Sequence, residues 1–161
     1  MLYNEYADSM YRLVWRYVKS QADAEDIVMT GFVRIFKNIQ SFQSQGAGSF
    51  GGWMRKVMVN ESLMWLRKQH NFNLTESLED TLNEPDLEAF RELEAEDIYH
   101  CIAQLPTGYR TVFNLFAIEG YDHREIANML GVQEVTSRSQ LFKAKSLLKK
   151  MLTQEGFYYG T

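Results

Sequence analysis

One predicted helix near the C-terminal end of the chain has two chemically different faces. Steps of four, three and four residues place small or apolar side chains on one side, which we expect to be buried: Ser137, Leu141, Ala144 and Leu148. The opposite side carries one aliphatic residue and a set of cationic, hydroxyl and aromatic side chains: Val135, then Arg138, Ser139, Phe142, Lys143 and Ser146. Cations and hydroxyls bind phosphate oxygens and base edges, and an aromatic ring can contact a thymine methyl. A generic exposed helix explains the charges but not the phenylalanine, so this face is a predicted DNA-binding surface.

The residues before this helix indicate how it is held. A short amphipathic helix ends at a tight turn, Gly131-Val132, and its apolar residues are Ile126, Ala127 and Leu130. A short helix, a glycine-containing turn and a longer second helix are typical of a helix-turn-helix. Upstream, one predicted helix stops at Pro106 and the next ends at Gly120. The region 97–161 is therefore predicted to be a helical domain built on a helix-turn-helix.

A second set of polar side chains follows one edge of a helix predicted over residues 52–68. The members of this set, at steps of four, three and four, are Lys56, Asn60, Leu63 and Arg67. Beside the glycine-rich stretch 40–52, cations and an amide in this order could follow a phosphate backbone and contact bases. An ordinary solvated helix edge has the same pattern. The apolar face of this helix is expected to hold Trp53, Met54, Val57, Met58, Met64 and Trp65.

Two further helices are predicted before this one. The apolar face of the first consists of Tyr3, Tyr6, Met10, Leu13, Val14 and Tyr17. Ser20 is the predicted N-cap of the second, and acids in its first turn suit the positive end of the helix dipole. Its buried stripe is predicted to be Ile27, Val28, Phe32, Ile35, Phe36 and Ile39. Because strand-like alternation is not evident, the fold class is predicted to be all-α.

Charge divides the 161 residues into three regions. Residues 1–70 carry nine Lys/Arg and six Asp/Glu (+3), 71–100 carry one and ten (−9), and 101–161 carry seven and five (+2), which gives the net −4. Two small helical domains, 1–70 and 97–161, are therefore predicted to flank an acidic linker over 71–96. A plain solvated linker between helical domains would have the same charge.

Several classes of protein do not fit the sequence. Cys101 is the single cysteine and the three histidines are scattered, so neither a disulfide nor a metal site is expected. His123 is interpreted as an exposed polar residue at a helix start. A nucleophile beside a base and a phosphate-binding loop are not evident, so we expect no enzyme and no cofactor. Apolar runs are short and a leader is not evident, which predicts a cytoplasmic protein without membrane insertion.

Motifs in this order and spacing resemble those of the extracytoplasmic-function (ECF) sigma factors, the small initiation subunits of bacterial RNA polymerase. The first domain matches in Ala24-Glu25-Asp26-Ile27-Val28, Phe32, Phe50, Trp53, Val59-Asn60 and Leu66-Arg67-Lys68. The second matches in Leu105-Pro106, Tyr109-Arg110, Phe113, Gly120-Tyr121, Glu125-Ile126-Ala127, Leu130-Gly131, Thr136, Arg138-Ser139 and Phe142-Lys143-Ala144. Two departures are Met29-Thr30-Gly31, where the family usually has a Gln-Glu pair, and Lys143, where arginine is more common.

The resemblance implies a function and a set of contacts. Core RNA polymerase would bind Asp23, Glu25, Asp26, Ile27 and Met29. The −10 element would be melted and read by the loop 43–51 and by Lys56, Asn60 and Arg67. The −35 element would be read by Arg138, Ser139, Phe142 and Lys143. The acidic linker would occupy a channel built for nucleic acid, and an anti-sigma factor is a further partner that the resemblance allows. A helix-turn-helix regulator that does not replace the sigma subunit is the alternative.

Overall fold

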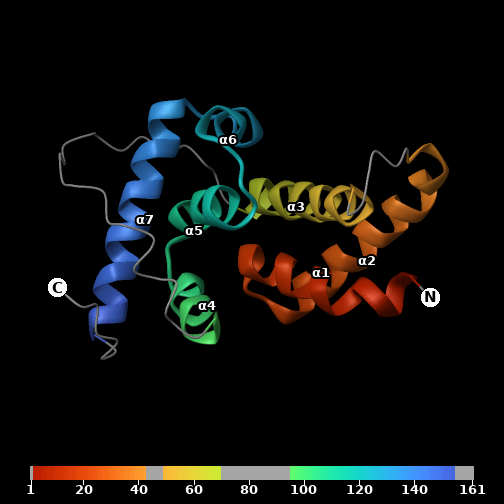
Figure 1. Cartoon of the computed structure of the whole chain (residues 1–161), viewed down its shortest axis with the longest axis horizontal. Helices are drawn as coiled ribbons and strands as arrows, with labels where there is room; N and C mark the ends of the chain where they lie inside the picture. The colour runs from red at the N-terminus through yellow and green to blue at the C-terminus, as the bar shows by residue number, and fades with distance from the viewer. Residues whose placement is uncertain (1, 43–48, 70–94, 155–161) are drawn as a thin grey trace. The chain divides into compact units, whose positions relative to one another are not determined.

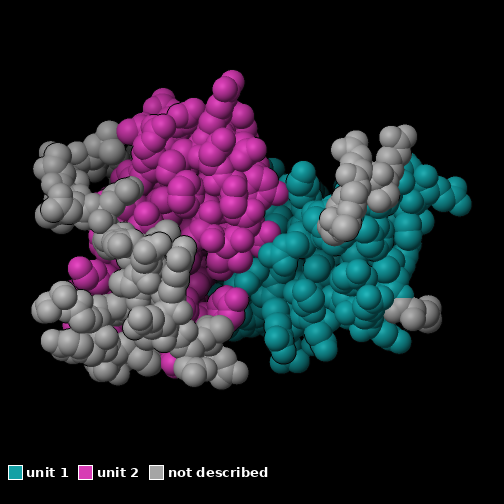
Figure 2. Space-filling view, in the orientation of Figure 1, with its two compact units in different colours: residues 1–71 teal, residues 72–161 magenta. Residues whose placement is uncertain are grey.

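The computed structural model describes residues 2–42, 49–69 and 95–154. Every regular element among these residues is a helix, which confirms the all-α prediction (Figure 1). The chain divides into two compact units, Met1–Asn71 and Phe72–Thr161 (Figure 2). The acidic linker predicted over 71–96 lies almost entirely outside the described residues. Within those residues, no helix has the length and apolar character needed to cross a membrane.

Unit 1 is built from three helices that pack against one another (Figure 1). They are α1 (Leu2–Val18), α2 (Gln21–Asn38) and α3 (Ser49–Gln69), with a short 3₁₀ turn, η1 (Ile39–Ser41), after α2. The core takes large side chains from all three helices, including Leu13, Val14, Tyr17, Ile35, Met54, Met58 and Leu66. Burial of these apolar surfaces is the main force that holds the unit together.

The turn between α1 and α2 confirms the predicted N-cap. Lys19 has a left-handed backbone (φ 58°), which ends α1. The Ser20 hydroxyl then accepts a hydrogen bond from the Asp23 amide at 3.3 Å. A side-chain oxygen at this position satisfies one of the free amides of the first helical turn.

Gly31 leaves room on α2 for the end of a methionine side chain from α3. A Cβ atom at this position would overlap the sulfur and terminal methyl of Met58, which is fully buried on α3. Glycine in a helix interior costs about 1 kcal/mol relative to alanine. Close packing of the two helices explains why a glycine is present at this position despite that cost.

Several predicted positions in unit 1 are wrong. Phe36 and Ile39 were predicted in the buried stripe of the second helix, but their exposed fractions are 47% and 39%. Leu63 was predicted on the polar edge of α3, yet its exposed fraction is 1%. Conversely, Met64 of the predicted apolar face is exposed. Helix α3 also begins at Ser49, three residues earlier than predicted.

Unit 2 contains four α-helices among the described residues (Figure 1). These are α4 (Ala95–Ala103), α5 (Thr107–Phe113), α6 (His123–Leu130) and α7 (Glu134–Gln154). Pro106 is the N-cap of α5, as its position predicted, and α5 widens into a π-helix, η3 (Asn114–Ile118). The predicted core face of α7 is confirmed, since Ser137, Leu141, Ala144 and Leu148 are all buried.

We predict that Gly31→Ala destabilises unit 1 by about 1 kcal/mol, because overpacking of a core costs about 1–3 kcal/mol and exceeds the gain in helix propensity. All three tryptophans, Trp15, Trp53 and Trp65, lie in unit 1. Denaturant unfolding followed by tryptophan fluorescence therefore reports on this unit.

The matched background is Met58→Ala, which removes the side chain that the new methyl group would meet. In that background Gly31→Ala should be neutral or stabilising, and the two variants should therefore be strongly coupled. An equal loss of stability in both backgrounds would contradict close packing as the reason for the glycine.

Candidate functional site

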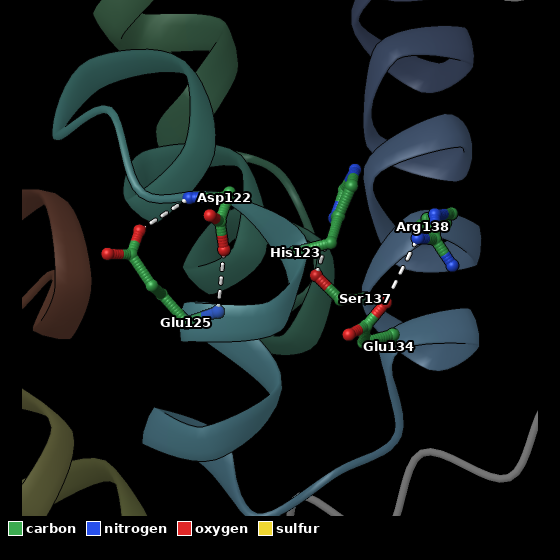
Figure 3. A network of polar contacts seen from close by, with 6 residues as sticks. All are labelled: Asp122, His123, Glu125, Glu134, Ser137 and Arg138. Atoms are coloured by element: carbon green, nitrogen blue, oxygen red, sulfur yellow. Dashed lines mark hydrogen bonds and ion pairs between the residues drawn. The ribbon is translucent and has the colours of Figure 1, made fainter.

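Helix α6, the first helix of the predicted helix-turn-helix, is capped at both ends, and Figure 3 shows the cap at its start. The Asp122 side chain accepts from the Glu125 amide at 2.8 Å, and the Glu125 side chain accepts from the Asp122 amide at 2.9 Å. This reciprocal capping box satisfies two free amides at the helix start. At the other end Gly131 adopts the left-handed conformation (φ 68°), which suits a residue without a Cβ atom. The angle at which α6 leads into α7 is thus set locally.

His123 connects α6 to α7, which corrects its interpretation as an exposed polar residue. Its Nδ1 lies 2.8 Å from the Oγ of buried Ser137 (Figure 3). Its ring also stacks on Phe116, with centroids 4.6 Å apart. The Lys145 ammonium, on a largely buried side chain, lies 6.0 Å from the centroid of the Phe116 ring. Contacts among side chains of η3, α6 and α7 therefore fix the position of α7 relative to α6 and η3.

Arg110, which lies in one of the motifs that resemble those of sigma factors, has a structural role in unit 2. Its guanidinium is buried and donates a hydrogen bond to the Leu105 carbonyl at 2.9 Å. This bond ties α5 to the turn between α4 and α5. Burial disfavours the charged form and lowers the pKa of Arg110 to about 10. The side chain is thus unavailable for contact with a nucleic acid phosphate.

The four residues predicted to read the −35 element all lie on the accessible side of α7. Arg138 is exposed, and Ser139, Phe142 and Lys143 are half-buried. They are spread over two turns of a helix whose opposite face is buried in the unit core. A face of this size and composition can enter a major groove and contact both phosphates and base edges.

Arg138 is paired with an acid that the sequence analysis did not single out. Its Nη2 donates to Glu134 Oε2 at 3.0 Å, one helical turn earlier (Figure 3). Glutamate four residues before arginine is a recognisable helix-surface pair, so this contact could have been predicted from spacing alone.

In unit 1 the structure brings together three of the four residues predicted along the edge of α3. Lys56, Asn60 and Arg67 are exposed, whereas Leu63 is part of the core. Behind this edge Glu61 is 7% exposed, and its Oε1 lies 2.6 Å from Arg34 Nε of α2. The ion pair stabilises the buried carboxylate and joins α2 to α3.

An aromatic cluster lies at the start of α3. The Phe42 ring stacks on Trp53 with centroids 5.1 Å apart, and Phe50 contacts both rings and Tyr6. Phe42 precedes and Phe50 follows residues 43–48, which lie outside the described residues together with most of the predicted −10 loop. The cluster therefore fixes the two described ends of that segment.

The predicted polymerase-binding residues of α2 are divided between surface and core. Glu25, Asp26 and Met29 are exposed and Asp23 is half-buried, whereas Ile27 is buried. Ile27 was expected to contact polymerase, but its side chain packs inside unit 1 because it lies on the face of α2 that forms the core. Ile27 therefore contributes to the core that supports α2.

Sequence reasoning identified Met29 but missed the apolar surface that continues from it. Met29, Val33 and Phe36 recur at steps of four and three on α2, and their exposed fractions are 55%, 49% and 47%. Large exposed apolar side chains on one helix face commonly mark a protein interface. Their spacing was the available signal, but Phe36 had been placed in the buried stripe.

Comparisons with known proteins agree with this geometry. Two family models match the chain in order: Sigma-70 region 2 over residues 2–72 and Sigma-70, region 4 over residues 95–148. The ECF RNA polymerase sigma factor SigE of Mycolicibacterium smegmatis is 29% identical, over 95% of this chain and 61% of that protein. This chain thus spans less than two thirds of that relative. The RNA polymerase sigma factor SigV of Bacillus subtilis is 25% identical, over 94% of this chain and 89% of that protein.

The fold is also found among solved structures. The sigma factor RpoE of Bartonella quintana, solved in complex with the anti-sigma factor NepR, superimposes with a TM-score of 0.57 at 17% identity. The match covers 94% of each chain. With two sigma-70 regions in the order that the family requires, the chain belongs to the sigma-70 family of RNA polymerase sigma factors, in its ECF subfamily.

Proposed function

We propose that this chain directs core RNA polymerase to specific promoters and starts transcription by recognising −10 and −35 elements and melting the DNA. The observation that supports this most strongly is the presence of two sigma-70 regions, each with a long helix that exposes polar side chains. The chain acts by binding, with no catalytic step of its own and no cofactor. A helix-turn-helix regulator is disfavoured, because it would not need the region 2 unit formed by α1, α2 and α3.

The proposed division of labour follows the two units. Residues 1–70 bind core polymerase and the −10 element, 71–96 form an acidic linker, and 97–161 bind the −35 element. The Bartonella relative was solved with an anti-sigma factor, so an anti-sigma protein is a further proposed partner. Binding to core polymerase and promoter DNA places the proposed activity in the bacterial cytoplasm.

Helix α7 is the proposed −35 reader. Arg138 is the best candidate for a base contact, because the forked donors of its guanidinium match guanine O6 and N7. Ser139 and Lys143 would bind phosphate oxygens or base edges, and Phe142 would contact a thymine methyl or a sugar. Buried Ser137 and Leu141 support this face from behind.

We predict that Arg138→Ala weakens binding to the preferred −35 sequence by about 1–3 kcal/mol and relaxes preference at one base pair. Lys143→Ala should instead weaken binding to all sequences alike and reduce the salt dependence, as expected for a phosphate contact. Binding of the holoenzyme to duplexes with single −35 changes, at several salt concentrations, measures both effects. Unchanged binding of Arg138→Ala to every duplex would remove α7 from the proposed role.

The exposed edge of α3 is the proposed −10 reader. Lys56 and Arg67 supply cations for the backbone, and Asn60 supplies an amide for a base. Extraction of a base from the stack costs a few kcal/mol, which contacts with the extracted base must offset. The aromatic cluster of Phe42, Phe50 and Trp53 supports this proposal, because it fixes the start of α3.

We predict that Asn60→Ala reduces open-complex formation on duplex promoters more than on promoters melted beforehand over the −10 element. The reason is that the variant loses a contact that offsets the cost of melting. Gln69→Ala, which changes an exposed amide at the end of the same helix, is the matched control. Equal losses on the two templates would indicate that Asn60 has a structural role instead.

The exposed face of α2 is the proposed polymerase-binding surface. Glu25 and Asp26 supply negative charge, and Met29, Val33 and Phe36 supply apolar area. Acids at the rim of an interface act mainly on encounter and specificity, whereas a buried apolar centre supplies most of the affinity.

We predict that Glu25→Lys/Asp26→Lys weakens capture of core polymerase while the fold of both units is kept. Reversal of Glu5 and Asp8 on α1, two other exposed acids, changes the net charge equally and is the control. Pull-down of core polymerase at low and moderate salt measures the effect. Equal capture by both reversed proteins and the wild type would show that this face is not the docking surface.

A further inference from the structure

The first turn of α7 contains a charge pair within the proposed DNA-binding face. Glu134 is the first residue of the helix, and its carboxylate receives Arg138 Nη2 at 3.0 Å (Figure 3). Both side chains are accessible, with exposed fractions of 43% for Glu134 and 58% for Arg138. A carboxylate on a surface that meets phosphates is unfavourable by itself, so its presence there requires a reason.

The pair restricts the conformations of Arg138. Arginine is long and has many rotamers, and it loses this freedom when it binds a base. Glu134 accepts from one terminal nitrogen and leaves the other guanidinium N–H groups available. A guanidinium held in this way loses less conformational entropy when it contacts a base. It is also less able to turn toward a neighbouring phosphate.

The carboxylate also acts on DNA that lacks the preferred sequence. Non-specific affinity comes mainly from cations that neutralise phosphates. Glu134 neutralises part of the charge of Arg138 and repels phosphates near it, so binding to arbitrary sequence is weakened. At the preferred sequence, the base contact of Arg138 compensates for that repulsion.

From these contacts we infer that Glu134 is a positioning and specificity-determining residue for −35 recognition. It holds Arg138 toward one base pair and disfavours phosphate contacts elsewhere. This inference rests on the proposed role of Arg138 as a base reader.

A purely structural role for Glu134 makes a different prediction. An acid in the first turn stabilises a helix through the helix dipole. Loss of that effect would lower the thermal stability of unit 2 without a change in which base pair is preferred. Base preference and salt dependence therefore separate the two roles.

The test uses holoenzyme assembled from core polymerase and the full chain. It is bound to a duplex library randomised over the −35 region, and the bound DNA is sequenced at several salt concentrations. Glu134→Ala should reduce preference at one base pair by about 2- to 10-fold, a fraction of the discrimination that a bidentate base contact provides. It should also increase binding to random sequence and make the salt dependence steeper.

Two companion variants isolate the cause. Asp97→Ala removes an acid from α4, which Figure 1 shows beside the C-terminal half of α7 and away from Glu134, and it should leave base preference unchanged. In an Arg138→Ala background, Glu134→Ala should no longer change base preference. If Glu134→Ala is poorly folded, Glu134→Gln replaces it, because it removes the charge and keeps the length of the side chain. It should change base preference in the same direction.

The outcomes separate this inference from the proposed function. If Arg138→Ala alters base preference and Glu134→Ala does not, the positioning role is overturned while α7 remains the reader. If Glu134→Ala alters preference equally without Arg138, Glu134 acts on DNA directly and the positioning role is again overturned. If neither variant alters preference, the base-reading role of Arg138 fails as well.

Discussion

Burial of one face of α7 against the rest of unit 2 is the interaction on which the proposed DNA-binding surface depends. Leu141, Ala144 and Leu148 fill the core, so the side chains opposite them must be accessible. The hydrogen bond between His123 and Ser137 then fixes how α6 meets this helix. Because the same helix supplies core and surface, the positions of the exposed side chains follow from the packing. A rotation of α7 would expose its core residues and bury its polar ones, at a large cost in apolar burial.

In unit 1, helix α3 likewise has one buried face and one exposed face. Met54 and Met58 are buried, which leaves Lys56 and Asn60 exposed on the other side. A three-helix unit of this size has little apolar surface to spare, and most of its stability must come from one small core. The close approach of α2 and α3 allowed by Gly31, together with the Arg34–Glu61 ion pair, makes that core compact. Gly31 thus has a packing reason in this chain.

Local signals in the sequence predicted much of this architecture, and the errors have physical causes. The Ser20 cap, the Gly131 turn and the core face of α7 depend on neighbouring residues, so they could be predicted. Periodicity shows which residues share a helix face but not how wide an arc the neighbouring helices cover, which is why Leu63 and Phe36 were assigned to the wrong environments. The contacts of His123 and of Glu61 join different helices and depend on packing that spacing does not reveal. The exposure of the polar residues at 56, 60 and 138 could be predicted from helical periodicity.

The chain contains a sigma-70 region 2 unit and a region 4 unit, and a simple helix-turn-helix regulator would not need the first of these. The most direct test is in vitro transcription from a genomic promoter library by core polymerase freed of other sigma factors, with this chain as the only added protein. We predict specific transcripts whose mapped start sites share common −10 and −35 elements. Transcripts that appear only when another sigma factor is also present would contradict this and would identify the chain as a regulator.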